Sequence, residues 1–224
     1  MTTRRALVVR ALVAAAMAAV VVTGCSSSGG SQSPSPSGSP TGPQTYTDAQ
    51  FGYSFGYEPP FAVVDGATLS AQAGNPADSM VAVMDGSGPQ LEGSATNGWM
   101  VTAYSLAQPI TSANLPMARA ELEKNIIPAL TKQGYKVGSL TEKAVAGSPA
   151  FVASATPTAA KDKVRSMLYF VFAGPTQYQI VTQASDDTWS SMQPTFEKFL
   201  SSFTIPAAPS SSSAPPSVSS SPSP

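Results

Sequence analysis

The amino-acid sequence predicts an α+β domain in which a mostly antiparallel sheet packs against helices. Three observations support this fold class. Between residues 45 and 205, short segments with the apolar patterning of strands recur on both sides of a helical segment. A second helical segment ends the domain, and turn residues separate neighbouring strand segments, so that hairpins join them. An order of strands, helix, strands and helix is typical of α+β domains.

The first strands are predicted from aromatic and apolar patterning. In Phe51–Tyr57 every second residue is aromatic, which is the period of a strand, and Pro59-Pro60 ends it. A short apolar segment follows at Phe61–Val64. Met80–Met84 is a continuous apolar run of the kind found in buried strands, and Trp99–Leu106 is rich in strand-forming residues.

The first helix is predicted over Asn114–Gln133. Asn114 can cap its N-terminus, Pro116 suits the first turn, and Gly134 suits the position just after the helix. One face carries an apolar residue at every fourth position: Ala118, Leu122, Ile126 and Leu130. Pro128 lacks an N–H group, so we expect it to kink the last turn or to end the helix near Ile127.

Two pairs of strands follow. Tyr135–Ala146 is more polar and suits a sheet edge, and Gly147-Ser148 is the predicted turn to Pro149–Ala155. Arg165–Phe172 and Gln177–Thr182 are strongly patterned strands. We expect a hairpin loop at Gly174-Pro175-Thr176 to join them.

The last helix begins at an acidic pair, Asp186 and Asp187, whose charge favours a helix N-terminus. Pro194 predicts a short first turn followed by a main helix from about Pro194 to Ser201. Large apolar residues follow in steps of three and four: Trp189, Met192, Phe196, Phe199 and Phe203. Such a stripe is typical of a helix packed on a sheet, and we interpret it as core rather than as a cofactor site.

The N-terminus has the pattern of an export signal. Three arginines (Arg4, Arg5 and Arg10) flank the start of an apolar run of 12 residues, Ala11–Val22, which is shorter than the roughly 20 residues of a membrane-spanning helix. The run ends in Val22-Thr23-Gly24-Cys25, which resembles the lipobox of bacterial lipoproteins. The resemblance implies cleavage before Cys25 and lipidation of its thiol. The Arg4-Arg5 pair leaves the twin-arginine and general secretory routes both open.

The sequence therefore divides into four regions. Residues 1–24 are the predicted lipoprotein signal peptide, and residues 25–44 are the lipidated cysteine with a Ser/Pro/Gly-rich tether. Residues 45–205 form the domain, and residues 206–224 are a Ser/Pro-rich tail. The tether and tail are too poor in apolar residues to offset the entropy of ordering, so both are predicted to be disordered.

Composition excludes several kinds of chemistry. The chain has no histidine, and Cys25 is its only cysteine, which excludes Ser-His-Asp catalysis and zinc sites built from His or Cys. No glycine-rich phosphate motif is present, so we expect no metal or cofactor. Without the three signal-peptide arginines, 12 − 3 = 9 basic residues face 13 acidic ones. The resulting net charge of 9 − 13 = −4 argues against a nucleic-acid partner. Lys161, Lys163 and Arg165 form a small basic cluster, interpreted as a solvated loop.

Both ends of the domain resemble a known family. The segments YTDAQFGYSFGYEPPF (Tyr46–Phe61) and YQIVTQASDDTWSSMQPTFEKFLSSFTI (Tyr178–Ile205) resemble the entry hairpin and the closing strand and helix of PsbP-like domains. With its lipobox and tether, the chain is similar to actinobacterial lipoproteins of the LpqN type. The resemblance implies an α/β/α sandwich that serves as a binding or assembly partner and not as an enzyme. It marks no ligand-binding residue.

Besides a purely structural spacer that binds no ligand, three functions remain open from the sequence. The first is a membrane-anchored, non-enzymatic binding or scaffolding module whose partner is a protein, a glycan or a lipid of the cell envelope. The second is a carrier of a small amphipathic, lipid-like ligand held between sheet and helix, suggested by the eight methionines. The third is a histidine-free hydrolase with a Ser–Lys dyad, for which Ser139, Lys143 and Ser166 are the candidates.

Overall fold

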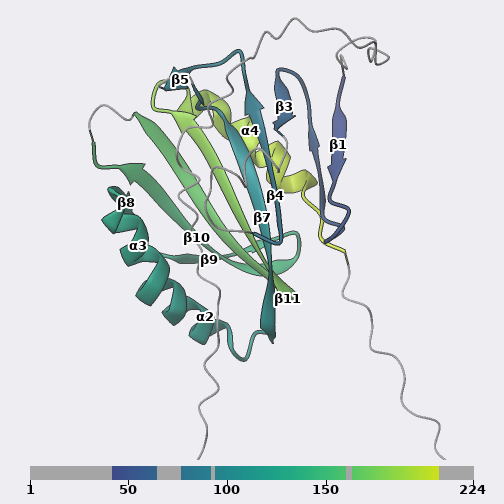
Figure 1. Ribbon diagram of the computed structural model, residues 1–224, viewed down its shortest axis with the longest axis vertical. Coiled ribbons are helices and arrows are strands. Elements are labelled where there is room, and N and C mark those ends of the chain that lie inside the picture. The colour runs from purple at the N-terminus through teal and green to yellow at the C-terminus, as the bar shows by residue number, and fades with distance from the viewer. Residues whose placement is uncertain (1–41, 65–76, 92–93, 160–162, 207–224) are drawn as a thin grey trace, which may run out of the picture.

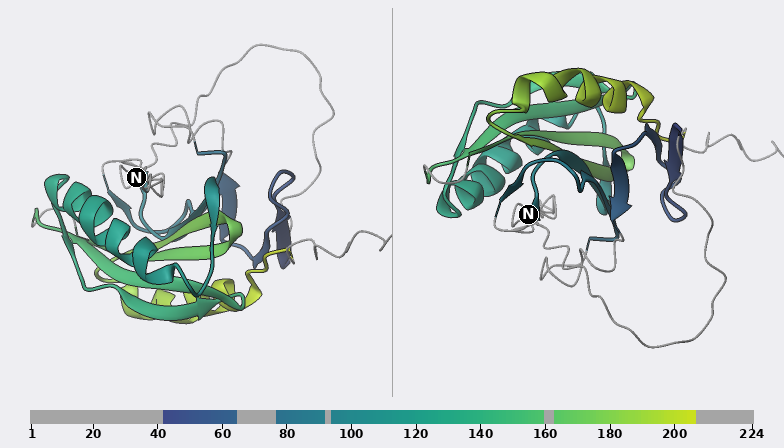
Figure 2. Two further views of the ribbon diagram at one scale, coloured as in Figure 1. Left: turned by 90° about the horizontal axis from the view of Figure 1, so that it is seen from below. Right: turned by 90° about the horizontal axis from the view of Figure 1, so that it is seen from above.

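The computed structural model describes residues 42–64, 77–91, 94–159 and 163–206. Its main sheet has the strand order β3-β4-β7-β11-β10-β8, and β9 also pairs with β10. Every strand pairing within it is antiparallel. Helix α4 packs on one face and helices α2 and α3 on the other (Figures 1 and 2). The predicted α+β class is confirmed, as an α/β/α sandwich. The predicted signal peptide, residues 25–41 and the tail from residue 207 lie outside the described ranges.

The N-terminal hairpin stands apart from the main sheet and consists of β1 (Gln44–Thr47) and β2 (Ser54–Tyr57). The strand predicted over Phe51–Tyr57 is therefore too long. Gly52 has a φ of 67°, a left-handed conformation that a strand cannot contain. The period of two survives in the packing, because Tyr53 and Phe55 are both buried against the sheet.

The first strands of the main sheet are β3 (Phe61–Val64), β4 (Ser79–Asp85) and β7 (Gly98–Ile110), which confirm three predicted strands. β7 extends further than its apolar pattern indicated. A small separate hairpin, β5 (Gln90–Leu91) and β6 (Ser94–Ala95), lies between β4 and β7 in the chain.

The first helical segment is continuous but irregular. It consists of α2 (Leu115–Glu121), a π-helical turn η1 (Leu122–Ile126) and α3 (Ile127–Lys132). Pro128 does not end the helix, because the wider π turn just before it accommodates the missing N–H and the bulk of the ring. The predicted stripe is confirmed, since all four side chains at its positions are buried.

The ends of this segment differ in how well they were predicted. Gly134 follows the helix with a φ of 88°, as expected for its position. Asn114 does not cap the helix with its side chain. Its Oδ1 instead accepts a hydrogen bond from the Thr111 backbone N (2.6 Å), and its Nδ2 donates to the Pro109 carbonyl (3.0 Å). The Asn114 side chain thus bonds to the backbone of the preceding turn and is not available to cap the helix.

The predicted edge strand Tyr135–Ala146 is divided in two, β8 (Tyr135–Val137) and β9 (Thr141–Val145), and both pair with β10 (Ser148–Pro157). The turn between β9 and β10 is Ala146-Gly147 and not Gly147-Ser148. Both turn residues have positive φ, 50° and 74°, as a two-residue type I′ hairpin requires.

β11 (Val164–Ser185) covers 22 consecutive residues and doubles back on itself. A straight strand of that length would extend about 70 Å, yet the Asp186 N donates to the Lys163 carbonyl at 2.8 Å. Lys163 and Asp186 are therefore paired. If each following residue pairs with the residue preceding its partner, the two strands meet at a two-residue turn, Gly174-Pro175. Gly174 has the positive φ (58°) that the first position of a type II′ turn requires. The predicted hairpin between these strands is therefore confirmed.

The last helix, α4 (Trp189–Ser202), is one uninterrupted helix. The prediction of a main helix starting only at Pro194 is wrong. Pro194 costs one backbone hydrogen bond, which is outweighed by burying the stripe that includes Met192, Phe196 and Phe199. The predicted packing of this stripe on the sheet is confirmed: the Phe199 ring stacks on Trp99 with centroids 4.7 Å apart.

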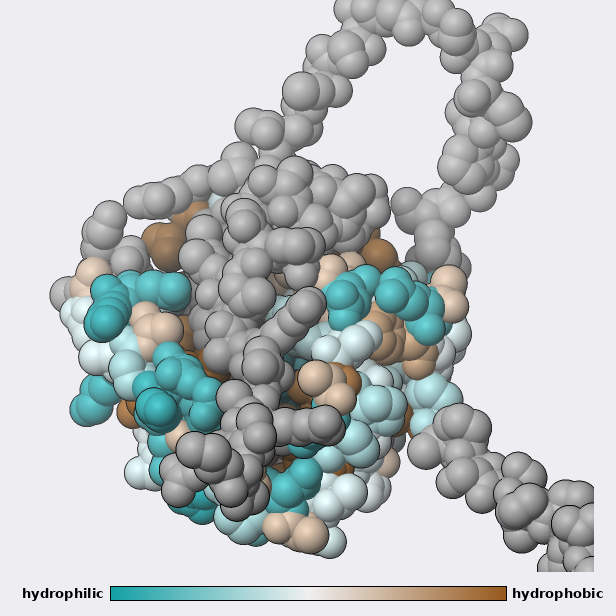
Figure 3. Space-filling model, turned by 60° about the horizontal axis from the view of Figure 1, so that its bottom comes forward, coloured by the Kyte–Doolittle hydropathy of each residue, from teal (hydrophilic) through white to brown (hydrophobic). Residues whose placement is uncertain are grey.

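The described part of the chain exposes few large hydrophobic residues. Val63 and Met117 are its exposed large hydrophobic residues. On the side seen in Figure 3, hydrophilic and hydrophobic residues are interspersed. Within the described residues, no helix is both long and apolar enough to cross a membrane.

Candidate functional site

The structure does not bring the candidate Ser–Lys dyad together. Lys143 lies on β9 opposite Ala150 of β10, whereas Ser166 lies on β11 opposite Ala155 at the other end of β10. Five residues of strand separate these positions, about 17 Å. Ser139 is exposed between β8 and β9, and all six lysines of the described part are exposed. None of them is in the desolvated setting that activates a lysine base.

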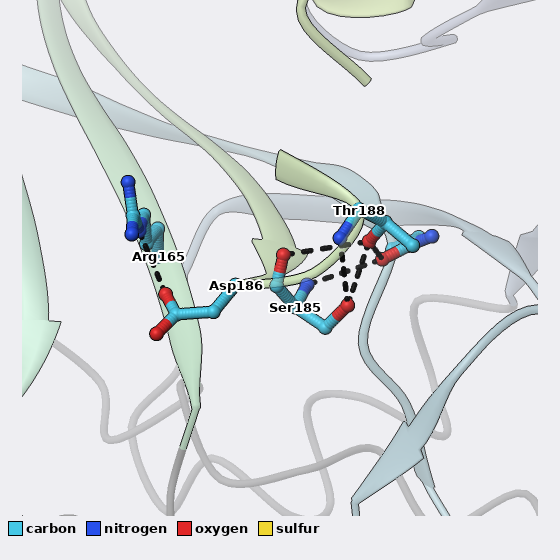
Figure 4. A network of polar contacts seen from close by, with 5 residues as sticks. Arg165, Ser185, Asp186 and Thr188 are labelled. Atoms are coloured by element: carbon cyan, nitrogen blue, oxygen red, sulfur yellow. Dashed lines mark hydrogen bonds and ion pairs between the residues drawn. The ribbon is translucent and has the colours of Figure 1, made fainter. Parts of the chain in front are cut away.

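Two other sets of predicted residues are only partly described. Cys25 lies outside the described residues. So does Lys161 of the basic cluster, while Lys163 is exposed. Arg165 is not simply solvated: its Nε donates to Oδ1 of Asp186 at 2.7 Å (Figure 4). Asp186 is thus a partner of β11 and not the predicted helix cap.

A cleft with a volume of about 450 Å³ opens where α4 begins. We call it the Trp189 cleft. Its walls come from the end of β10, the start of β11 and the first residues around α4. The side chains that give it its character are Ser154, Thr156, Arg165, Met167, Asp186 and Trp189. The volume falls in the range of about 300–1,000 Å³ that is usual for small-molecule sites.

Strand alternation places the cleft on the α4 face of the sheet. Val152 packs under α4, so Ser154 and Thr156, two and four residues further along β10, face the same way. Tyr169 also packs under α4, and Met167 and Arg165 precede it on β11 by two and four residues. The cleft therefore lies where the sheet extends beyond the N-terminal end of α4.

A polar network fixes the corner that carries the cleft (Figure 4). The Oδ1 of buried Asn97 accepts hydrogen bonds from the Ser185 backbone N (3.2 Å) and the Thr188 hydroxyl (2.9 Å). The Ser185 and Thr188 hydroxyls are 2.7 Å apart. These contacts hold the start of α4 to β7, and the Trp189 ring packs on Phe196 with centroids 5.8 Å apart. Trp189 is consequently held in place before any ligand arrives.

A second feature lies on the opposite face of the sheet, beside α2 and α3. Met80, Met84, Met100, Gln177 and Gln179 form what we call the Gln–Met face. Val181 and Met100 are paired across β11 and β7. Gln179 and Gln177 precede Val181 on β11 by two and four residues, so they face the same side of the sheet. Gln177 is fully buried, yet among the residues that the structure describes neither atom of its side-chain amide has a hydrogen-bond partner, and the Gln179 Nε2 also lacks one there. Unpaired buried amides are unfavourable by about 1–3 kcal/mol each.

The buried tyrosines are the titratable groups with the clearest environmental effect. Burial raises the pKa of Tyr53, Tyr104, Tyr169 and Tyr178 above the usual value, because a phenolate would lose its hydration. These side chains stay neutral at physiological pH. Within the described ranges, no three acidic, cysteine or histidine side chains gather as metal ligands would.

Sequence reasoning missed the Trp189 cleft. The apolar stripe places Trp189 wholly in the core, and the sequence predicts a solvated loop around Arg165 and a helix cap at Asp186. One signal in the sequence points to part of the cleft. A hairpin with its loop at Gly174-Pro175-Thr176 places the start of its first strand beside the end of its second, which brings Arg165 close to Asp186. The sequence does not predict that the start of α4 lies beside Arg165 and Asp186.

Comparison with known proteins identifies the fold. No protein-family model matches the chain, and no curated protein matches it in sequence. Among solved structures, the solution structure of cyanobacterial PsbP (CyanoP) from Synechocystis sp. PCC 6803 superposes with a TM-score of 0.53 at 15% sequence identity. The match covers 79% of this chain and 98% of that chain. The chain therefore has a PsbP-like fold, an antiparallel sheet with helices on both faces.

Proposed function

We propose that this protein is an exported lipoprotein whose PsbP-like domain is a non-enzymatic binding module of the cell envelope. In this proposal the chain is cleaved before Cys25, and lipid on Cys25 holds it to the extracytoplasmic face of the cell membrane. The lipobox pattern before Cys25 supports the anchor. The order of lipobox, tether and PsbP-like domain resembles that of actinobacterial lipoproteins of the LpqN type.

The Trp189 cleft is the observation that carries the binding function. It combines an ion pair, hydroxyl groups and an aromatic ring in a space of ligand size. Binding sites need such a mixture, because apolar surface supplies affinity and a few polar groups supply orientation. Catalysis by acyl transfer needs an activated nucleophile. Ser166 lies far from Lys143 along the sheet, and Ser139 and Lys143 are both exposed to solvent, which does not activate a lysine base.

Because of the tether, a low intrinsic affinity of the domain for its partner is sufficient for binding at the membrane. A domain attached to the membrane by residues 25–44 meets envelope components at a high effective concentration. Binding and scaffolding at the membrane therefore require only the anchor and one recognition site.

In-cell photocrosslinking tests the proposal. A photoreactive amino acid replaces Thr156 at the rim of the cleft, and the matched control replaces Thr131, which is exposed on α3 at the opposite face. We expect a discrete adduct from position 156 and none from position 131. The anchor is tested with Cys25→Ser, for which we expect an uncleaved precursor that carries no lipid, as measured by its intact mass. Equal adducts from both positions, or a lipid-modified, cleaved Cys25→Ser protein like the wild type, would contradict the respective half of the proposal.

A second candidate function is supported by the Gln–Met face: a carrier of an amphipathic, lipid-like ligand. Methionine side chains adapt to varied apolar ligands, and the unpaired amides of Gln177 and Gln179 can bond to a polar group of the ligand. Native mass spectrometry of gently purified protein distinguishes the two functions. A carrier should retain a non-covalent mass of lipid size, and Gln177→Leu should reduce that retention. A protein with no bound mass in either form would eliminate the carrier function.

A further inference from the structure

We infer that the Trp189 cleft recognises a neutral saccharide unit. This inference rests on the proposed binding function and specifies the chemistry of its ligand. It follows from the charge balance, the aromatic surface and the hydroxyl groups of the cleft.

The charge balance argues against a charged ligand. Arg165 and Asp186 are joined at 2.7 Å, so their charges cancel at the cleft wall. An anion would have to compete with Asp186 for Arg165, and a cation would have to compete with Arg165 for Asp186. A neutral group that can donate and accept at once bonds to both partners without breaking the pair, and a hydroxyl is such a group.

The ion pair remains accessible to such a ligand. The side chains of Arg165 and Asp186 are 50% and 41% exposed. A guanidinium offers five N–H donors in a fixed plane, and a carboxylate offers two acceptor oxygens. Side by side, they match neighbouring hydroxyls of one sugar ring. Ser154 is exposed and Thr156 half-buried on the adjacent strand, and they add hydroxyls of their own.

Trp189 supplies the apolar half of the recognition. Its indole is half-buried in the cleft wall and braced by Phe196. One face of a pyranose ring presents C–H groups, which pack on an aromatic plane while the hydroxyls point outward to polar partners. An acyl chain would match Trp189 and Met167, but it would leave the ion pair and the hydroxyl side chains dehydrated without partners, which is unfavourable. The cleft therefore fits a sugar better than a lipid tail.

Saturation-transfer NMR on the purified full-length protein in detergent micelles tests the inference. The probes are glucose, mannose, galactose, N-acetylglucosamine, maltose and cellobiose. We expect saturable transfer to at least one of them, insensitive to added salt. Trp189→Ala should abolish the transfer, and Asp186→Asn should weaken binding roughly tenfold, about the effect of one lost charge-assisted hydrogen bond.

The chain contains a matched control for the ion pair. Glu58 and Lys198 form a second exposed pair at 2.8 Å towards the other end of α4, so Glu58→Gln should leave binding unchanged. Trp189→Tyr keeps an aromatic plane and should retain part of the binding even if Trp189→Ala folds poorly. The inference is overturned if no sugar shows transfer, or if Asp186→Asn and Trp189→Tyr bind as the wild type does. It is also overturned if inorganic phosphate displaces the sugar, since the site would then be an anion site.

The two proposals fail separately. An adduct from position 156 in cells, together with no saccharide binding in vitro, would remove the saccharide and leave the binding module intact. The absence of both would remove the proposed function with it.

Discussion

Asp48 shows how one buried carboxylate organises the N-terminal hairpin. Its side chain is 6% exposed. Oδ1 accepts hydrogen bonds from the backbone N of Gln50 (3.0 Å) and of Phe51 (2.6 Å), which shapes the turn between β1 and β2. Oδ2 accepts a bond from the Ser79 hydroxyl at 2.5 Å, which ties that turn to β4. The Asp48 side chain thus joins the N-terminal hairpin to the main sheet, although in the described part of the chain the two share no strand pairing.

We expect Asp48→Ala to lower the free energy of unfolding by about 3 kcal/mol, because buried donors lose a charged acceptor. Urea unfolding followed by circular dichroism measures this change. The control is Asp187→Ala, an exposed acid just before α4, for which we expect a change within about 0.5 kcal/mol. Equal stability of the two variants would mean that the hairpin is held by its aromatic packing alone.

The β11 hairpin is the element that assembles the cleft. Its turn brings the start and the end of β11 together, and the start contributes Arg165 while Asp186 follows the end. The turn depends on the left-handed conformation of Gly174, where an added Cβ would meet no atom within 4 Å. Any effect of a substitution there is therefore a backbone effect and not a steric one.

Gly174→Ala should lower the free energy of unfolding by about 1 kcal/mol, the cost of a left-handed conformation for an L-residue. Gly86→Ala is the matched control. It also meets no atom within 4 Å, and its φ is not in the left-handed range. We expect no loss of stability from it, as measured by thermal unfolding. If both variants lose the same stability, the turn does not have the conformation described.

At the scale of the molecule, two layers of side chains enclose the sheet, and they differ in kind. The layer under α4 is rich in aromatic residues, including Tyr53, Trp99, Tyr169, Tyr178 and Phe199. The layer under α2 and α3 is mostly aliphatic with three phenylalanines. Most of the buried tyrosines belong to the α4 layer and give it a response to alkaline pH, and buried Tyr104 adds to this response from the opposite face of the sheet.

The direction of that response follows from the raised tyrosine pKa values. An unfolded tyrosine titrates near pH 10, and burial raises the pKa of Tyr53 and Tyr178 in the folded state. Below about pH 10 both states are neutral, and the stability is fully present. Above it the unfolded chain releases protons that the folded domain retains, so stability falls as pH rises. We expect phenolate absorbance to appear together with loss of the folded circular dichroism signal. Gradual ionisation of all tyrosines without unfolding would contradict this.

Local patterns in the sequence are sufficient to predict most of the helices and strands. An apolar residue at every fourth position gives a helix one apolar face, and that face is buried whichever element the helix packs against. Leu122 and Ile126 are therefore predictable as core residues without knowledge of their packing partner. A period of two does the same for strands, and Gly174-Pro175 fixed a hairpin because few residues tolerate its conformation.

At several residues, long-range packing overrules the local preference of the sequence. Pro194 is retained inside α4 because burying the apolar stripe outweighs one lost hydrogen bond, and Pro128 is retained because a π-helical turn precedes it. The side chains of Asn114 and Asp186 do not cap their helices, since these side chains bind other partners. The Trp189 cleft was decided at this level too. Its walls come from segments that meet only when the β11 hairpin and α4 pack on one face, and contacts between distant segments leave no periodic trace in a sequence.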